Sequence, residues 1–252
     1  MEYGYCSTTL VPCRAEGSDR SEMVNQLLFG ETYQVLETTD NWVRVVTLLD
    51  RYEAWIDRKL HCELSEEQLH TYRELPKTVV NEPVVQLLSL KNESRISLSY
   101  GAILPASENG TFSIGSNVYR LEAPLNQADA SLTAFSTQFL NAPYLWGGKS
   151  LFGADCSGFT QVVFRIFDRW IPRDAWQQEL VGTAVELENV LPGDLAFFGK
   201  KDGKITHVGI CMGSGKIIHC SGRCRIDLLD EKGILNTETN SYSHDLRSIK
   251  RL

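Results

Sequence analysis

Alternating apolar and polar positions dominate the first half of the chain. Between about residues 3 and 60, strand-like runs such as TLVPCRA, ETYQVLETT and DNWVRVVTLL are separated by turn clusters rich in Gly, Asp, Asn and Ser. This pattern predicts a small β-barrel or sandwich over residues 1–62. Strand-like runs return between residues 78 and 121, and they predict a second small β domain over residues 77–124.

Helical spacing appears in two further places. Residues 63–76 are predicted to form a partly helical linker, because Ser65 can cap a helix, acidic residues follow in its first turn and Pro76 ends it. After Pro124, apolar residues recur at helical intervals before strand-like runs return. This mixture predicts a third, α+β domain over residues 125–252.

Composition and charge narrow the possible function classes. The chain has 252 residues, 42% of them hydrophobic and 23% charged, which is typical of a folded globular protein and excludes a disordered or fibrous one. A formal net charge of −7 opposes broad attraction to nucleic acid or to an anionic membrane, so we expect neither as a partner. No apolar run approaches the ~18 residues that a membrane-spanning helix needs.

The cysteines and the N-terminal segment bear on the compartment. Seven cysteines form an odd, irregularly spaced set, which favours reduced thiols over a disulfide framework. The N-terminal segment lacks the basic and then apolar regions of a secretory signal peptide. We therefore predict a cytoplasmic protein, although a mature chain whose signal peptide has been removed would look the same.

Cys156 lies at the predicted N-terminus of a helix whose first turn covers residues 155–158. The apolar stripe of that helix consists of Phe159, Val162, Val163, Ile166 and Phe167. Unpaired N–H groups and the positive end of the helix dipole favour a thiolate there, as a nucleophile requires. Glycines crowd the same stretch and would let a substrate backbone lie close to the sulfur: Gly147, Gly148, Gly153 and Gly158. Taken alone, such a cysteine is more often buried and inert.

Two histidines lie on consecutive strands of a predicted pair of hairpins. The segment 195–229 reads as strands joined by a Lys-Asp-Gly turn and a Gly-Ser-Gly turn. If the second loop spans residues 212–216, His219 falls opposite Gly209 and diagonal to His207 on the same face. Such diagonal neighbours lie ~7–8 Å apart at Cα, within reach of two imidazoles. A four-residue loop would put the two rings on opposite faces.

Cys156 and this histidine pair together favour nucleophilic catalysis, because an activated cysteine needs a base and the base needs an orienting partner. We interpret the other histidines as structural: His61, His70 and His244. A zinc site is less favoured, since Cys220 and Cys224 lack a paired CxxC or HExxH partner. Alternation also puts His219 and Cys220 on opposite faces. We predict no metal and no cofactor.

Five segments occur in an order that resembles a known family. They are APYLWGGKSLFGADCSGFTQ, IPRDAWQQ, LPGDLAFF, THVGI and IIHCSG, and across about residues 142–222 they resemble the NlpC/P60 family of papain-like cysteine peptidases. The upstream β domains resemble bacterial SH3-like modules. The whole arrangement is similar to the cytoplasmic γ-D-glutamyl-L-diamino acid endopeptidases that recycle murein peptides. The resemblance implies hydrolysis of the bond between D-γ-glutamate and a diamino acid in peptides with a free N-terminal L-alanine.

The resemblance also assigns catalytic roles to particular residues. It implies that Cys156 is the nucleophile, that His207 is the base and that His219 orients the base. The tyrosine of the family's PYxWGG run falls on Tyr144, whose hydroxyl is implied to help hold the oxyanion.

Five further residues are implied to bind substrate. Asp155 and Ser157 flank the nucleophile and are implied to shape the pocket; a carboxylate beside a thiolate makes sense if it also holds a substrate ammonium. In similar proteins the first SH3-like domain closes the groove with a tyrosine and a glutamate, which match Tyr52 and Glu22. Their alternatives are a barrel-rim aromatic and a solvated loop charge. Trp146 either packs or walls the groove.

The sequence therefore predicts a cofactor-free cysteine peptidase, most simply a monomer, whose substrate is a murein-derived peptide. Arg173 and Asp174 fit either a substrate carboxylate or a structural pair at a helix start, and we favour structure. One alternative is a non-catalytic module that binds cell-wall fragments. Another is an acyltransferase using the same thiolate, which the polar, glycine-lined surroundings of Cys156 make less favourable.

Overall fold

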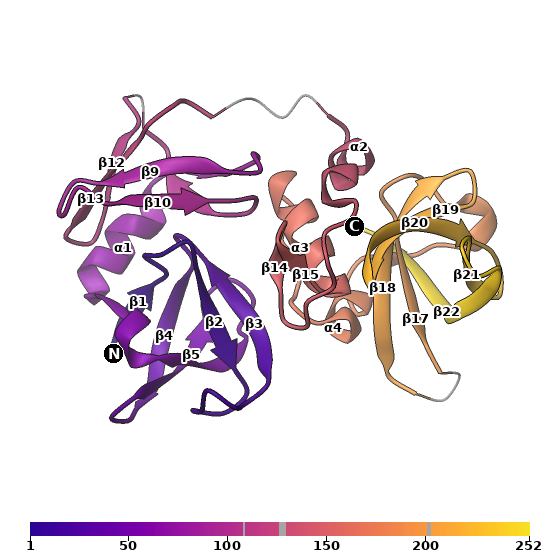
Figure 1. Ribbon diagram of the computed structural model, residues 1–252, viewed down its shortest axis with the longest axis horizontal. Helices are drawn as coiled ribbons and strands as arrows, with labels where there is room; N and C mark the ends of the chain where they lie inside the picture. The colour runs from indigo at the N-terminus through magenta and orange to yellow at the C-terminus, as the bar shows by residue number, and fades with distance from the viewer. Residues whose placement is uncertain (108, 126–129, 201–202) are drawn as a thin grey trace. The chain divides into compact units, whose positions relative to one another are not determined.

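The computed structural model describes residues 1–107, 109–125, 130–200 and 203–252 (Figure 1). The chain divides into two compact units, residues 1–128 and residues 129–252. Each unit is considered separately below.

The first unit begins with an antiparallel seven-stranded sheet in the order β3-β2-β6-β5-β4-β1-β7. Its strands are β1 (Tyr3–Tyr5), β2 (Leu10–Arg14), β3 (Met23–Leu28), β4 (Thr32–Thr38), β5 (Trp42–Thr47), β6 (Glu53–Asp57) and β7 (Cys62–Leu64). Alternate side chains such as Val11 and Cys13 are buried against a core that includes Leu27, Val43 and Ile56. The predicted β region is therefore confirmed as strands, and a short 3₁₀ turn at Arg58–Leu60 precedes the last of them.

The segment predicted as a linker contains helix α1 (Glu66–Glu74). Ser65 caps it as expected: its hydroxyl accepts from the Gln68 N–H, and the Gln68 side chain accepts from the Ser65 N–H. Leu69 and Tyr72 on this helix are buried in a hydrophobic core, so the segment contributes to the folded unit.

The second β region forms two small sheets. Its strands are β8 (Lys77–Val79), β9 (Val85–Ser89), β10 (Arg95–Leu98), β11 (Ile103–Pro105), β12 (Thr111–Ile114) and β13 (Asn117–Leu121). The order is β10-β9-β13-β12 in one sheet and β11-β8 in the other. Tyr5 and Phe29 of the first region share one core with Leu87 and Tyr119 of the second, and the Tyr5 and Tyr119 hydroxyls lie 2.8 Å apart. The two β regions therefore pack around a common core.

The second unit combines short helices with a second seven-stranded sheet. Its elements are α2 (Leu132–Ser136), β14 (Lys149–Ser150), β15 (Gly153–Ala154), α3 (Cys156–Ile166), α4 (Ala175–Glu179), β16 (Thr183–Ala184), β17 (Leu195–Gly199), β18 (Ile205–Gly213), β19 (Lys216–Ser221), β20 (Arg223–Leu229), β21 (Gly233–Asn236) and β22 (Ser241–Arg251). Single 3₁₀ turns lie at Thr137–Phe139 and Leu187–Asn189. The sheet order is β16-β22-β17-β18-β19-β20-β21. Because β22 also pairs with β21, strands β17 to β22 close into a ring to which β16 is added at β22, and Figure 1 shows α2, α3 and α4 on one side of it.

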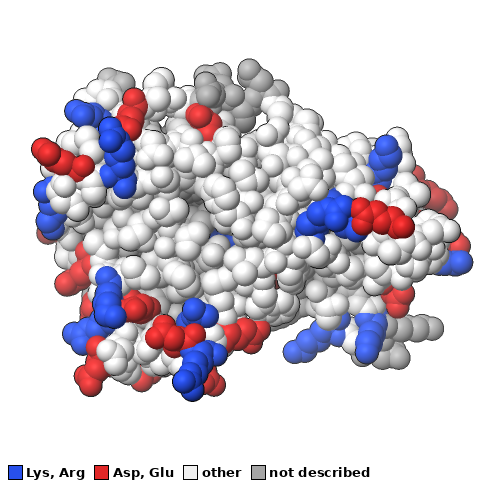
Figure 2. Space-filling view, viewed as in Figure 1, with Lys and Arg blue, Asp and Glu red and all other residues white. Residues whose placement is uncertain are grey.

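Surface charge is mixed. Figure 2 shows acidic and basic side chains close to one another, with no large area of one sign on the face it presents. Among the residues that the structure describes, no helix is long and apolar enough to cross a membrane.

Candidate active site

Helix α3 places Cys156 as its first residue. The predicted helix start is confirmed: Asp155 is the N-cap, and its carboxylate accepts a hydrogen bond from the Gly158 N–H at 2.6 Å. Phe159, Val162 and Val163 of the predicted apolar stripe are buried, Ile166 and Phe167 are only partly buried, and Cys156 itself is 6% exposed. The sulfur also hydrogen-bonds with the backbone of Val208, the neighbour of His207 on β18. The cysteine therefore lies against the strand that carries the predicted base.

A buried ion pair holds the Asp155 carboxylate. Arg173, which is 1% exposed, approaches its two oxygens at 2.7 and 3.1 Å. The Gly147 N–H donates to the same carboxylate at 2.8 Å, and Ser157 bridges Asp155 and Arg173 through its hydroxyl. The Arg173 guanidinium therefore balances the charge of the carboxylate beside the nucleophile. From the sequence, a substrate ammonium was expected to do so. The substrate-binding roles of Asp155 and Ser157 stay predictions.

The glycines around Cys156 allow close packing of the backbone. A Cβ on Gly158 would lie 2.2 Å from the Gly148 carbonyl oxygen, and a Cβ on Gly148 would lie 2.4 Å from that of Gly153. Gly147 has a φ of 78°, which side-chain-bearing residues rarely adopt. These positions thus allow the loop to lie directly on α3. Backbone packing therefore requires glycine at 148 and 158, and the close approach of a substrate backbone stays a prediction.

The expectation of a stabilised thiolate is wrong for the substrate-free chain. Burial, and next the Asp155 carboxylate, raise the pKa of the Cys156 thiol to about 12. Hydrogen bonds with the backbones of Val208 and Ser157 and the charge of Arg173 act in the opposite direction but do not outweigh burial. Cys156 is therefore a neutral thiol at rest, and any attack by sulfur requires a base.

The hairpin of β18 and β19 has the expected register but a different loop. Cys211 pairs with Ile217 and Gly209 with His219, as predicted. The strands, however, continue to a two-residue turn at Ser214 and Gly215, with φ values of 52° and 67°. A β-bulge between Cys211 and Gly213 absorbs the odd residue, so the shorter loop keeps the same face. The Lys-Asp-Gly turn predicted before β18 falls partly outside the described residues.

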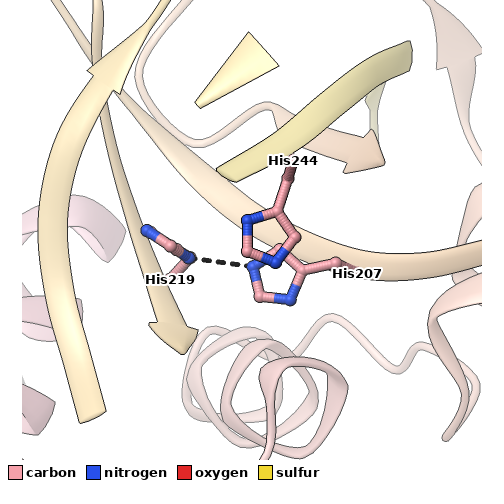
Figure 3. A group of neighbouring side chains, drawn as sticks. All are labelled: His207, His219 and His244. Carbon is pink, nitrogen blue, oxygen red and sulfur yellow. Dashed lines mark hydrogen bonds between the residues drawn. The ribbon is translucent and has the colours of Figure 1, made fainter. Parts of the chain in front are cut away.

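The two predicted histidines meet. His207 Nε2 lies 2.8 Å from His219 Nδ1, and both side chains are buried (Figure 3). Gly209 lies opposite His219, where a Cβ would come within 2.9 Å of the His219 Cβ. The glycine therefore leaves the space through which His219 reaches its diagonal neighbour.

Two further residues of this cluster were missed. Asp227 on β20 lies 3.0 Å from His219 Nε2, and alternation in the RCRIDLL strand, which carries polar residues at every second position, is the signal that could have found it. His244 on β22, which we had interpreted as structural, stacks on His207 with ring centroids 4.0 Å apart (Figure 3). It lies outside the family motifs, and no sequence signal pointed to it.

Three imidazoles could in principle hold a metal ion, since one nitrogen each of His207, His219 and His244 lies within 4.8 Å of the others. Both nitrogens of His219 are already engaged, one with His207 and one with Asp227. The contacts are those of a hydrogen-bonded chain of side chains, which can orient and transfer protons.

The other predicted residues are placed as follows. Tyr144 is half-buried, and burial, followed by the neighbouring Cys156 and Asp155, raises the pKa of its phenol, so its hydroxyl stays protonated and able to donate. Trp146 is exposed. In the other unit, Tyr52 is partly buried against the barrel core, where its N–H donates to Thr47 Oγ1, and the side chain of Glu22 is exposed. Binding roles for these residues stay predictions.

Comparisons with known proteins agree with the fold and the motifs. Residues 141–242 match the NlpC/P60 family, and residues 13–59 match the bacterial dipeptidyl-peptidase Sh3 domain. A γ-D-glutamyl-L-lysine dipeptidyl-peptidase of Bacillus subtilis is 35% identical over 77% of this chain and 71% of its own. A protein of the same name from Bacillus cereus is 29% identical over 80% of this chain and 68% of its own.

A solved structure extends the likeness to the whole fold. The crystal structure of an NlpC/P60 family protein from Bacillus cereus superposes with a TM-score of 0.79 at 20% identity, covering 99% of both chains. The fold thus defines an α+β domain that follows an N-terminal SH3 domain in the sequence. The chain belongs to the NlpC/P60 family, and it is an enzyme of the cysteine peptidase type. The match to an SH3 domain covers the first β region only.

The state of His207 leads to an expected pH dependence. Burial, and next His244 and His219, lower the pKa of His207 well below 6.5. Burial likewise lowers the pKa of His244 to about 4. Because a base must be unprotonated, we expect the acid limb of kcat/KM to lie below pH 6.5. The unfolded chain takes up these protons from about pH 6.5 downward and the folded chain does not, so stability falls over the same range.

Peptidase assays between pH 4 and 8, with Tm measured in parallel, check this expectation. A His70→Gln variant, which changes an exposed histidine, should leave the limb in place. An acid limb at or above pH 6.5 in a chain that is still folded would contradict it.

Proposed function

We propose that this chain is a cysteine endopeptidase that hydrolyses the γ-D-glutamyl–diamino acid bond of murein peptides with a free N-terminal L-alanine, releasing L-Ala-γ-D-Glu. The observation that carries the proposal is the buried chain of side chains from His207 through His219 to Asp227. The Cys156 thiol contacts the backbone of β18, the strand that carries His207. The names of two relatives support the γ-D-glutamyl bond and lysine as an accepted diamino acid.

The acylation step follows from the protonation states. The Cys156 thiol gives its proton to His207 as the sulfur attacks the γ-glutamyl carbonyl carbon, since the thiol is neutral at rest. The oxyanion accepts from the Cys156 N–H, which has no partner within the helix, and from the Tyr144 hydroxyl. His207 then returns the proton to the leaving amine of the diamino acid, leaving a thioester on Cys156.

Deacylation reverses the roles. His207 takes a proton from water, whose oxygen attacks the thioester carbonyl, and the same proton restores the Cys156 thiol as the sulfur leaves. The dipeptide L-Ala-γ-D-Glu departs with a free carboxylate. Each residue ends the cycle in its starting state, so no cofactor is consumed.

Selectivity for a free amino group is assigned to Asp155, Glu22 and Tyr52. A carboxylate that pairs the α-ammonium, together with an N-terminal domain that blocks longer chains, would restrict cleavage to free peptides. The exposure of Glu22 is compatible with this role. The peptide substrate, a cytoplasmic location and a monomeric state belong to the same proposal. The location is supported by seven cysteines, none of which forms a disulfide in the described structure.

Paired substrates test the selectivity. L-Ala-γ-D-Glu-L-Lys is expected to be cleaved, whereas its N-acetylated form should lose at least about 10²-fold in kcat/KM, because acetylation removes a charge and leaves a binding carboxylate unpaired. Product release is followed by chromatography. Glu22→Gln should weaken discrimination, and Glu16→Gln on the same surface serves as its control.

Equal rates on both peptides would contradict the assigned selectivity. Tight binding of the free peptide without any turnover would instead support a non-catalytic module. Transfer of an acyl group to an added amine in preference to water would indicate an acyltransferase.

A further inference from the structure

Asp227 is a buried carboxylate with an unusually complete set of donors. Its Oδ1 accepts from the Thr237 N–H at 2.9 Å, the Thr237 hydroxyl at 3.0 Å and an Arg225 N–H at 3.0 Å. Its Oδ2 faces His219 Nε2 at 3.0 Å and forms an ion pair with Arg225 at 2.8 Å. Burial acts to raise the pKa of Asp227, but the hydrogen bonds from His219, Thr237 and Arg225 outweigh it and hold the pKa below its usual range. The group is therefore an anion.

An anionic carboxylate can only accept hydrogen bonds, so His219 Nε2 must carry a proton. The neutral form of His219 then has a bare Nδ1, which can only accept. The atom that faces it at 2.8 Å is His207 Nε2, which must in turn carry a proton (Figure 3). His207 Nδ1 is left bare, and this nitrogen points away from His219 in Figure 3. It is the one available to take the proton of Cys156.

We propose that Asp227 is a positioning residue that fixes the tautomers of both His219 and His207, and so keeps the base in its proton-accepting form. The kinetic consequence rests on the proposed function, whereas the tautomeric state does not. Asp227 acts through two consecutive hydrogen bonds and touches neither the substrate nor the sulfur. Its effect on catalysis is therefore on the orientation of protons and not on binding.

The surroundings of Asp227 make the consequence of an Asp227→Asn substitution specific. Three donors converge on Oδ1, so the amide oxygen takes that place and the NH₂ group takes the place of Oδ2. Arg225 Nε near Oδ2 opposes this orientation, but one unfavourable contact costs less than three donors without an acceptor. The NH₂ then donates to His219 Nε2, which reverses both tautomers and places a proton on His207 Nδ1.

Kinetics of two variants separate this role from a structural one. Asp227→Asn is expected to lower kcat by about 10²–10⁴-fold with KM changed less than about threefold, since the lost contribution is that of the general base. Asp227→Ala leaves His219 free to adopt either tautomer and should lose less. If Asp227 only supported the fold, the nearly isosteric asparagine would be the milder change. An asparagine variant more active than the alanine variant would therefore overturn the proposal.

Nuclear magnetic resonance reads the tautomers directly and without substrate. In ¹⁵N-labelled full-length chain, His207 is expected to show a protonated Nε2 and a bare Nδ1, and Asp227→Asn should reverse this pattern. An unchanged pattern in that variant, or a protonated Nδ1 in the parent chain, would overturn the proposal. A reversed pattern in a chain that never cleaves the tripeptide would uphold the proposal and refute the proposed function.

Discussion

Replacing Cys156 by alanine is expected to abolish release of lysine from L-Ala-γ-D-Glu-L-Lys, with kcat falling on the order of 10⁶-fold, as when a covalent nucleophile is removed from a comparable triad. The side chain is small and nearly buried, so the fold should persist. Product chromatography under saturating substrate measures the loss. Substrate binding, followed by calorimetry, should be retained because the sulfur contributes little to ground-state affinity.

A Cys62→Ser variant provides the matched control. Cys62 is a partly buried cysteine of the N-terminal unit that takes no part in the proposed chemistry, and its replacement should leave kcat within about threefold. If Cys156→Ala still turned over substrate, Cys156 would not be the nucleophile. The chain would then share the family's fold without the proposed chemistry.

Replacing His207 by alanine should lower kcat by about 10⁴–10⁵-fold at pH 7. With a thiol pKa of about 12, only about 10⁻⁵ of the molecules carry a thiolate at that pH without a base. The residual rate of the variant is expected to rise about tenfold per pH unit between pH 7 and 9, because each unit raises the thiolate fraction tenfold. The parent chain should show no such rise.

Alkylation of Cys156 by iodoacetamide gives the same slope without substrate, and mass spectrometry of the labelled peptide identifies the site. His70→Ala, at an exposed position, should behave like the parent chain. A His207→Ala variant whose residual rate does not change with pH would mean that the sulfur is ionised by another group, contrary to the burial that sets its pKa.

Local patterns were sufficient to predict the catalytic helix and the histidine pair. The apolar spacing after Cys156 predicted a helix that begins there, and α3 does begin at Cys156, although its residues from Cys156 to Arg165 are buried on every side. Period-two alternation, together with an assumed five-residue loop, put His207 and His219 on one face, and the register of β18 with β19 confirms that face although the loop is shorter. Both inferences depend on short segments whose geometry is fixed by the backbone alone.

Properties that depend on packing could not be read in the same way. The resting state of Cys156 is decided by burial, which a single helix does not reveal. The contact of His244 with His207 joins strands far apart in the sequence, and no motif links them. The position of Asp227 could have been predicted in part. Extending the strand register to the hairpin of β19 and β20 would have placed Asp227 near His219.

The bulge in the β18–β19 hairpin means that catalysis here depends on residue count as much as on residue identity. His219 faces His207 only because the extra residue between Cys211 and Gly213 is accommodated on one strand. Substituting side chains in the Ser214–Gly215 turn keeps the register of the two strands. A single insertion or deletion within a strand would move one imidazole to the other face of the sheet. The length of this hairpin is therefore constrained as well as its glycines, since Gly213 and Gly215 have positive φ values and a Cβ on Gly209 would meet His219.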